Sequence, residues 1–162
     1  MSKKLLKGSI APVYGCMTSR LLILHVEDDP NDVLLLQRAC KKAGLNVQIE
    51  AVGDGDKAVN YLSGVEPYSN REQHPLPTLV LLDLKMPRRS GLEVLAWIRA
   101  QPALRRLLVA VFTSSKHDED INKAYELGAN SYLVKPVGFD ALVELMKMVN
   151  QYWFTINERP SA

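Results

Sequence analysis

The sequence predicts an α/β fold: a doubly wound, five-stranded parallel sheet of order 2-1-3-4-5 with helices on both faces. First, short apolar runs alternate with helical segments five times along the chain, which is the pattern of repeated strand–helix units. Second, runs such as Leu79–Leu82 are wholly apolar, as expected for parallel strands that are buried on both faces. Third, polar residues follow several of these runs directly.

Composition excludes several broad classes of protein. The 162 residues fit one domain, and Lys+Arg 20 against Asp+Glu 18 predicts no general attraction to nucleic acid or to an anionic membrane. No apolar run approaches the roughly 20 residues that a membrane span needs. The two cysteines, Cys16 and Cys40, form no CxxC pair, which argues against structural zinc or a disulfide scaffold. We therefore expect a reducing compartment and a cytoplasmic location.

The ends of the chain are predicted to lie outside the folded domain. Residues 1–20 contain basic residues but no acidic ones, and they lack the apolar run of a secretory signal. They are expected to form either a flexible leader or a basic docking arm. The folded domain is predicted at residues 21–154, followed by a tail at 155–162.

The first strand–helix–strand unit has clear boundaries. Leu21–Val26 is an apolar run and predicts a buried strand. Asp29 followed by proline is typical of a capped helix start, so a helix is expected from there to about Ala43, ended by Gly44. Val47–Ala51 alternates apolar and polar residues, which predicts a half-buried strand.

The middle of the chain continues this alternation. A second helix is expected at about Gly55–Leu62, after the turn made by Gly53 and Asp54. Ser63–Pro77 is polar, contains three prolines and predicts a long surface loop, a kind of segment that is often functional. Thr78–Leu84 is expected to contain a central parallel strand, and Gly91–Ala100 a helix that ends before Pro102.

The last third supplies two more strands and two helices. Strands are predicted at Leu107–Phe112 and Tyr132–Val134, with a helix at Asp118–Leu127 between them. The final helix is expected from about Phe139 to Trp153.

Polar side chains gather at the ends of the predicted strands. Asp28, Asp83, Thr113 and Lys135 follow the first, third, fourth and fifth strands, and in an open doubly wound sheet ligands bind at this edge. With strand order 2-1-3-4-5, Glu27, Asp28 and Asp83 meet between the first and third strands. Such carboxylates suit a hard divalent cation such as Mg²⁺, while Lys135 supplies a charge for a phosphoryl group. Each residue alone has an ordinary structural role, but the four together indicate phosphoryl transfer.

Four segments carry a family resemblance that covers about Leu21 to Asn150. They resemble the receiver domain of two-component response regulators, which has a flavodoxin-like fold. The segments are Val26–Asp29, Leu81–Pro87, Phe112–Ser114 and Tyr132–Pro136.

The resemblance implies specific roles at these positions. Asp83 is then the phosphoacceptor, which a sensor histidine kinase phosphorylates in the presence of Mg²⁺. Glu27 and Asp28 are the acidic pair, with Asp28 a direct metal ligand, and the backbone carbonyl of Lys85 completes the protein ligands. The family also implies a cis peptide bond between Lys135 and Pro136. The remaining roles are contacts to the phosphoryl oxygens for Thr113 and Lys135, and a conformational switch formed by Thr113 and Tyr132.

On this interpretation the chain is not an enzyme with a separate substrate but catalyses its own phosphorylation and dephosphorylation. A degenerate receiver that binds partners without accepting phosphate is the alternative. An aspartate-nucleophile phosphatase is disfavoured, because it needs a second carboxylate two residues after the nucleophile, where this chain has Lys85.

Two features resemble the single-domain regulators that partner bacterial and cyanobacterial phytochrome kinases: the long loop Ser63–Pro77 and the aromatic end Gln151–Phe154. The last helix carries one apolar stripe, with further apolar residues outside it. This pattern predicts either a core stripe with scattered exposed residues or, as we prefer, a homodimer through the last helix and aromatic tail. The stripe consists of Leu142, Leu145, Met146, Val149 and Trp153, and Val143, Met148 and Phe154 lie outside it.

Other polar residues have simpler interpretations. His25 is predicted to be a packed side chain in the first strand, whereas His74 and His117 are predicted to be solvated loop residues. Arg88 and Arg89 either steer a phosphorylated partner or are solvated.

Overall fold

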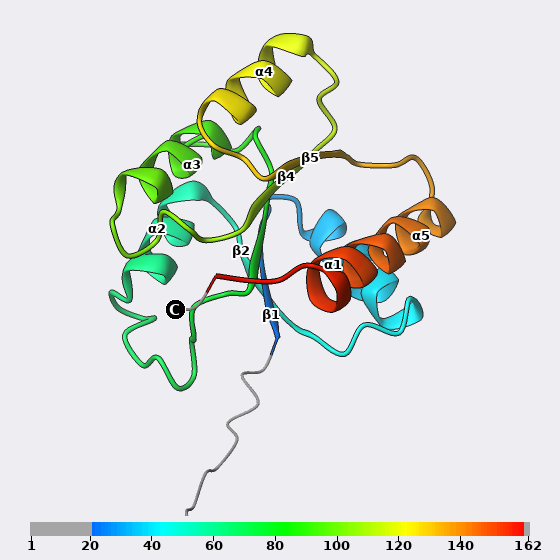
Figure 1. The fold of residues 1–162 in the computed structure, drawn as a ribbon, viewed down its shortest axis with the longest axis horizontal. Coiled ribbons are helices and arrows are strands. Elements are labelled where there is room, and N and C mark those ends of the chain that lie inside the picture. The colour runs from blue at the N-terminus through cyan, green and yellow to red at the C-terminus, as the bar shows by residue number, and fades with distance from the viewer. Residues whose placement is uncertain (1–20, 161–162) are drawn as a thin grey trace, which may run out of the picture.

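The structure is a computed structural model that describes residues 21–160. The predicted leader at 1–20 lies outside the described residues, as do residues 161 and 162. Within residues 21–160, five parallel strands form one sheet of order β2-β1-β3-β4-β5, which confirms the predicted fold class and strand order (Figure 1). The strands are β1 (Leu22–Val26), β2 (Gln48–Val52), β3 (Leu79–Leu82), β4 (Val109–Thr113) and β5 (Ser131–Val134).

Side chains cap the first three helices of the chain. The Asp29 side chain accepts a hydrogen bond from the Asn31 N–H at the start of α1, and Ser90 and Glu93 form a reciprocal capping box at the start of α3. The helices are α1 (Pro30–Lys42), α2 (Gly55–Ser63), α3 (Gly91–Ala100), α4 (Asp118–Glu126) and α5 (Phe139–Val149).

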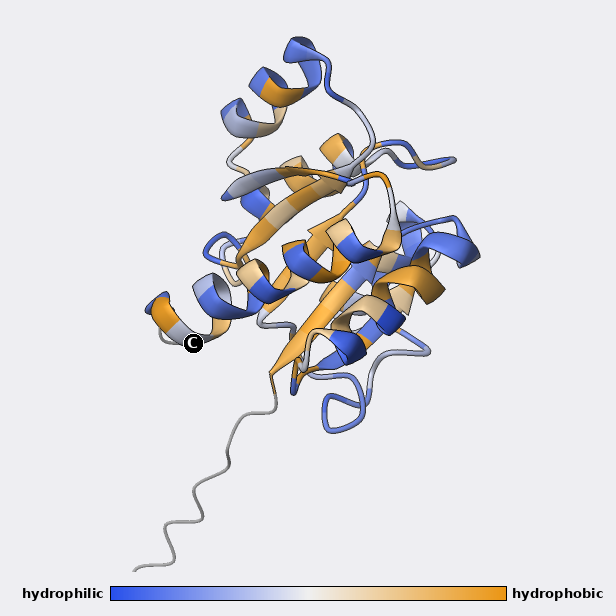
Figure 2. Ribbon diagram, turned by 90° about the vertical axis from the view of Figure 1, so that its right-hand side faces the viewer, coloured by the Kyte–Doolittle hydropathy of each residue, from blue (hydrophilic) through white to orange (hydrophobic). Residues whose placement is uncertain are grey.

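Two layers of helices bury the two faces of the sheet (Figures 1 and 2). α2 and α3 pack on alternate strand residues such as Leu24 and Leu82, while α1 and α5 pack on the opposite face, against residues such as Ile23 and Leu81. α4 is attached more lightly, because Ala124 is its one fully buried residue. The strands in Figure 2 are accordingly apolar along most of their length.

The last helix is longer and more irregular than predicted. α5 continues as a π-helix, η1 (Asn150–Ile156), so helical structure extends two residues past Phe154. Four of the five predicted stripe residues are buried, and Val143, expected outside the stripe, is buried as well. One apolar row stays exposed at a spacing of four residues: Met148 at 60%, Tyr152 at 52% and Ile156 at 61%.

The long loop between α2 and β3 is ordered by Arg71. Its guanidinium donates hydrogen bonds to the carbonyl oxygens of Tyr61 and Leu62 at 2.7 Å and of His74 at 3.1 Å. The prediction that His74 is solvated is wrong, because its ring packs edge-on against Tyr61 and Tyr68. These contacts join residues of the loop to the helix before it, and the half-buried His74 ring is part of an aromatic cluster with Tyr61 and Tyr68.

The family expectation of a cis peptide bond between Lys135 and Pro136 is wrong for this structure. Among the described residues the cis peptide bond joins Glu66 and Pro67. The backbone N–H of Lys135 donates to the Thr113 carbonyl at 2.8 Å, so the pairing of β4 with β5 continues up to the trans bond before Pro136. The Lys135 side chain reaches its carboxylate partners from this trans geometry.

Across residues 21–160, none of the helices combines the length and the hydropathy that a bilayer crossing requires.

Candidate functional site

The sheet brings the ends of its central strands to one edge. Val26 pairs with Leu82, and Leu82 pairs with Val111, so the residues that follow β1, β3 and β4 emerge side by side. The backbone N–H of Asp83 donates to the Val26 carbonyl at 3.1 Å and locks this register at the strand ends. The site is therefore a product of parallel strand pairing rather than of any single loop.

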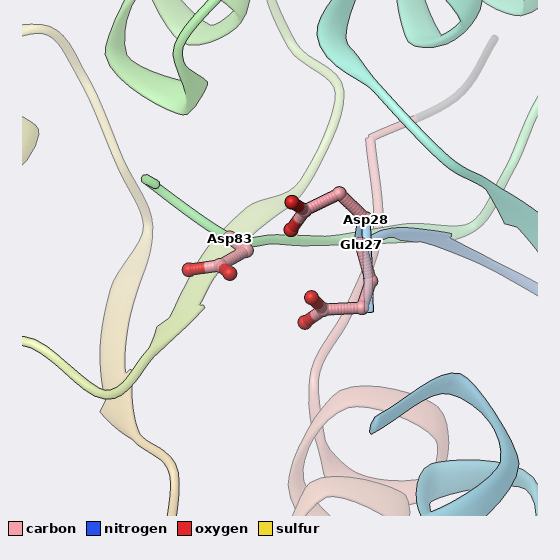
Figure 3. Close-up of side chains that lie close together, drawn as sticks. All are labelled: Glu27, Asp28 and Asp83. Carbon is pink, nitrogen blue, oxygen red and sulfur yellow. The ribbon is translucent and has the colours of Figure 1, made fainter. Parts of the chain in front are cut away.

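Three carboxylates converge at this edge (Figure 3). One oxygen from each of Glu27, Asp28 and Asp83 lies within 4.8 Å of the others. Glu27 is 2% exposed and Asp83 7% exposed, whereas Asp28 is open to solvent. The predicted convergence of these three side chains is confirmed. Burial raises the pKa of Glu27, although the hydrogen bond from Lys135 opposes that shift.

The donor set fits a divalent cation. Carboxylate oxygens that are close together repel one another, and a hard cation with several oxygen ligands relieves that repulsion. Two of the carboxylates are buried and the third faces solvent, so the cluster has protein ligands on one side and access for water or phosphate oxygens on the other.

Lys135 joins these carboxylates from the end of β5. Its ammonium donates to Glu27 at 2.5 Å, to Asp32 at 2.8 Å and to Asp83 at 3.4 Å. Burial by itself lowers the pKa of Lys135, but the hydrogen bonds to Asp32 and Glu27 and the charge of Asp83 outweigh it, and the pKa is raised. The lysine is therefore charged and points into the acidic cluster.

Asp32 is a site residue that the sequence analysis missed. It lies in the first turn of α1 and provides the second-shortest of the Lys135 contacts. The available signal was an acidic residue in the first turn of the helix that follows the first acidic strand end. Asp29, in contrast, acts as the helix cap that its sequence context predicts.

Thr113 and Tyr132 lie beside the acidic cluster, on β4 and β5. Thr113 is 1% exposed, and its hydroxyl accepts a hydrogen bond from the Ser115 N–H at 3.4 Å. The Tyr132 hydroxyl donates to the Ser115 carbonyl at 3.1 Å, and burial raises the pKa of Tyr132. Both residues thus contact the same residue of the loop between β4 and α4.

The loop after Asp83 is tied at both ends. One carboxylate oxygen of Asp83 accepts from the Leu84 N–H at 2.7 Å, and the Gly91 N–H donates to the Leu84 carbonyl at 3.0 Å. Lys85, whose carbonyl is a predicted metal ligand, follows at once and is exposed.

Arg88 and Arg89, at the far side of this loop, form ion pairs with the start of α2, although the Arg88 side chain stays 62% exposed. A role in steering a partner stays a prediction. Arg88 pairs with Asp54, and the Arg89 Nε donates to Asp56 at 3.0 Å. The acidic start of α2 supplies both partners, because Asp54 caps that helix and Asp56 lies in its first turn.

His25 is packed in β1, as predicted, but without hydrogen-bond partners. It is 0% exposed, and neither ring nitrogen has a partner within hydrogen-bond distance. Its Nε2 lies 4.0 Å from a Glu27 oxygen. Burial, with the charge of Lys135, lowers the pKa of His25 to about 3, so the ring is neutral at ordinary pH. His117 is exposed, as predicted.

The chain is similar in sequence to two relatives along most of its length. A probable methanogenesis regulatory protein, FilR2 of Methanothrix harundinacea, is 37% identical over 86% of this chain and 87% of its own length. Response regulator Rcp1 of Synechocystis is 34% identical over 87% of this chain and 94% of its own length.

Solved structures agree with these sequence matches. The phosphorylated cyanobacterial phytochrome response regulator RcpA superposes with a TM-score of 0.81 at 33% identity, over 88% of this chain and 100% of that one. The Mn(2+)-bound form of response regulator Rcp1 gives a TM-score of 0.77 at 33% identity, over 87% of this chain and 99% of that one.

The family model of the response regulator receiver domain matches residues 23–147, which include β2 to β5, all of β1 except Leu22, and all of the carboxylates described above. The chain belongs to the response regulator receiver domain family.

Proposed function

We propose that the chain is a single-domain response regulator that accepts a phosphoryl group on Asp83. The observation that carries this proposal is the convergence of Asp83 with Glu27, Asp28 and the charged amine of Lys135. An Asp83 oxygen attacks the phosphorus of a phosphohistidine, the P–N bond breaks, and the histidine nitrogen leaves with the electron pair and takes up a proton. Lys135 then exchanges a carboxylate partner for a phosphoryl oxygen. Hydrolysis of the acyl phosphate later restores the carboxylate.

Mg²⁺ is the proposed cofactor. When bound, it would neutralise charge on the carboxylates and on the phosphoryl oxygens. The proposed protein ligands are Glu27, Asp28, Asp83 and the backbone carbonyl of Lys85, with Asp28 the most open to solvent. The relative Rcp1 has an Mn(2+)-bound form, which supports the proposal that this chain binds a divalent cation.

Incubation with acetyl phosphate and Mg²⁺ tests the proposed acceptor. Intact-mass spectrometry should detect the added mass of one phosphoryl group, and chelation of the metal should abolish the gain. Asp83→Asn should remove the gain, whereas Asp56→Asn, a control at a half-exposed carboxylate in α2, should retain it. No gain in the wild-type protein would favour the alternative, a degenerate receiver that binds partners without phosphorylation.

The proposed phosphodonor is a sensor histidine kinase of the phytochrome type. RcpA, a phytochrome response regulator, supports this choice because the whole of RcpA aligns with 88% of this chain. We assign the exchange to the cytoplasm, where kinases obtain phosphoryl groups from ATP. Phosphotransfer from phytochrome-type and other candidate kinases, each compared with Asp83→Asn, tests the partner. Transfer from other kinases alone would reject the phytochrome assignment.

Thr113 and Tyr132 are the proposed switch. Phosphorylation adds roughly −1.5 to −2 charge at the site, which attracts the Thr113 hydroxyl and leaves room for the Tyr132 ring. Tyr132 would then release its hydrogen bond to Ser115. Amide exchange in the segment 113–118 should change on phosphorylation of the wild-type protein. Identical exchange before and after phosphorylation would reject this switch.

A homodimer through the last helix is also proposed. Its support is the exposed apolar row of Met148, Tyr152 and Ile156, which continues from α5 into η1. Analytical ultracentrifugation at tens of micromolar should detect a dimer that Met148→Glu weakens. Tyr125→Glu, at an exposed apolar residue on α4, is the matched control and should leave the dimer intact. A wild-type protein that stays monomeric would reject the proposal.

A further inference from the structure

Asp54 is a buried carboxylate that the proposed phosphoryl chemistry does not use. It is 2% exposed and lies between β2 and α2, not among the carboxylates of the acidic cluster. One of its oxygens accepts from the Lys57 N–H at 2.7 Å and caps α2. The other pairs with the guanidinium of Arg88, while the Lys57 amine lies farther away, at 4.0 Å. Arg88 is therefore the main ion-pair partner of the second oxygen.

Arg88 occupies a backbone conformation that favours glycine. Its φ is 65°, in the left-handed region, and it is the one non-glycine residue with positive φ among residues 21–160. Asp54 and Arg88 lie far apart in sequence but hold the tip of the loop between β3 and α3 in this conformation. The pairing of Arg89 with Asp56 adds a second, more exposed tie to the same helix.

The backbone contacts around this loop are also close. A Cβ on Gly55 would collide with the Arg89 carbonyl, and a Cβ on Gly91 would collide with the Asp83 carbonyl. Glycine at both positions thus lets the start of α2 abut the tip of the loop and lets the start of α3 abut the acceptor strand. The segment between Leu84 and Gly91 is closed at its base by their backbone hydrogen bond and held at its tip by Asp54.

We propose that Asp54 is a positioning residue for the candidate metal site: through Arg88 it fixes the loop that carries the Lys85 carbonyl. This inference rests on the proposed function for the identity of that carbonyl as a metal ligand. The physical reason is that a backbone ligand can be placed only by fixing the loop to which it belongs. A loop released at its tip would keep the Asp83 carboxylate in place but would lose the defined position of the carbonyl.

Asp54→Asn removes the ion pair with Arg88, which we call the clamp of the loop, but keeps the cap of α2. Asparagine caps helices as well as aspartate does, so α2 should remain, but the amide cannot form the ion pair with Arg88. Arg88→Gly removes the other partner and suits the positive φ, so it should not destabilise the loop by backbone strain. Asp56→Asn is the matched control, because it removes the partner of Arg89 and a longer contact to Arg88, at 3.8 Å, but leaves the Asp54–Arg88 pair in place.

Isothermal titration of the unphosphorylated proteins with MgCl₂ is the first measurement. Asp54→Asn and Arg88→Gly should each bind Mg²⁺ roughly tenfold more weakly than wild type. This is the lower end of the loss of metal affinity seen when residues that hold the metal ligands in position are replaced. Asp56→Asn should stay within twofold of wild type. Arg88→Gly leaves the buried Asp54 carboxylate with only the Lys57 amine nearby and should lower the midpoint of urea unfolding, so all titrations are run under conditions in which urea unfolding shows each variant to be folded. Wild-type affinity in both Asp54→Asn and Arg88→Gly would overturn the proposal.

Amide hydrogen exchange of the metal-free proteins is the second measurement, and it does not depend on metal binding. Segment 84–91 should exchange faster in Asp54→Asn and Arg88→Gly than in wild type or Asp56→Asn. Unchanged exchange would overturn the clamp even if the wild-type protein accepts phosphate. Failure of the wild-type protein to bind Mg²⁺ or accept phosphate would instead reject the proposed function and the metal-positioning role with it.

Discussion

The ammonium of Lys135 lies 2.5 Å from Glu27 and is nearer to it than to Asp83, at 3.4 Å. In this structure the lysine therefore provides the positive charge that holds the acidic cluster together. Glu27 is almost fully buried and has this ammonium as its one ion-pair partner among the charged lysine and arginine side chains of residues 21–160. A buried carboxylate that loses its cation is strongly destabilising, so the pair links the stability of the fold to the occupancy of the site.

Replacement of Lys135 by methionine should make folding depend on metal. Without metal, Lys135→Met is expected to lose roughly 3–5 kcal/mol of unfolding free energy, because Glu27 stays buried but loses its cation. Mg²⁺ should bind the variant more tightly than wild type, since no ammonium competes for the carboxylates. A hundredfold excess over Kd then restores about 2.7 kcal/mol.

Urea unfolding with EDTA and with increasing Mg²⁺ measures both effects. Lys85→Met removes a positive charge from the neighbouring loop at an exposed side chain and should behave like wild type. Equal metal-dependent stabilisation of Lys135→Met and wild type would contradict competition between the ammonium and the metal.

His25 should make the protein sensitive to acid. Its pKa is lowered to about 3 in the folded state, by burial first and by the charge of Lys135, with Asp32 opposing, against 6.5 for the unfolded chain. As pH falls below 6.5 the unfolded state takes up the proton first, so folding stability falls until about pH 3. Between pH 7 and pH 5 this loss amounts to about 2 kcal/mol.

His25→Leu should remove that part of the acid sensitivity. At pH 7 its stability should equal or exceed that of wild type, because two unpartnered ring nitrogens disappear. Urea unfolding of the metal-free proteins from pH 7 to pH 5 gives the comparison, in which all the other ionisable groups are common to both proteins. His117→Leu, at an exposed histidine, should keep the wild-type slope, and equal slopes for His25→Leu and wild type would contradict the prediction.

Local sequence rules predicted most of the sheet and the positions of the strand-end carboxylates. Wholly apolar runs such as Leu79–Leu82 are typical of parallel strands that are buried on both faces, and strand pairing then brings Glu27, Asp28 and Asp83 together. Proline and capping residues predicted the start of α1, and the bounds of α3 agree with the prediction.

Contacts between segments far apart in sequence were not predictable in this way. Asp32 is joined to Lys135, and Asp54 to Arg88, by tertiary packing, and the acidic first turn that contains Asp32 does not by itself identify Lys135 as its partner. His74 stands in a polar, proline-containing segment, and only the fold of the loop brings its ring against Tyr61. The continuation of the last helix as a π-helix likewise reflects the packing of Trp153 into the core, where it is 7% exposed.

Arg71 should control the order of the loop between α2 and β3. Its guanidinium donates to carbonyls on α2 and on the loop, and Arg71→Ala leaves these carbonyls without a charged donor. We expect a loss of about 2 kcal/mol of unfolding free energy and faster amide exchange in residues 64–77. The unfolding free energy and loop exchange of Arg71→Lys should lie between those of wild type and Arg71→Ala, because one ammonium cannot reproduce the planar guanidinium fork.

Hydrogen-exchange mass spectrometry compares the loop in these variants. Arg105→Ala, at an exposed arginine before β4, should leave exchange in residues 64–77 unchanged. Mg²⁺ affinity should be the same in all of them, because the loop is not part of the acidic cluster. Wild-type exchange in Arg71→Ala would mean that the aromatic cluster of Tyr61, Tyr68 and His74 is sufficient to order the loop.

Gly91 should be intolerant of even one added methyl group. A Cβ at this position would lie well inside van der Waals contact with the Asp83 carbonyl and close to the Leu84 backbone, and neither is a flexible side chain that can move away. Gly91→Ala should therefore displace the acceptor strand end or the start of α3, with a loss of about 3 kcal/mol of unfolding free energy. Gly53→Ala is the matched control, because a Cβ there meets nothing within 4 Å.

Thermal unfolding and Mg²⁺ titration together separate a stability effect from a site effect in these two variants. Gly53→Ala should keep wild-type values of both. Gly91→Ala should bind Mg²⁺ more weakly even at temperatures where it is folded, because the collision falls on the residue that carries the acceptor carboxylate. A Gly91→Ala protein with wild-type stability and affinity would mean that the backbone between Asp83 and Gly91 is free to shift, and that its close approach has no part in shaping the acidic cluster.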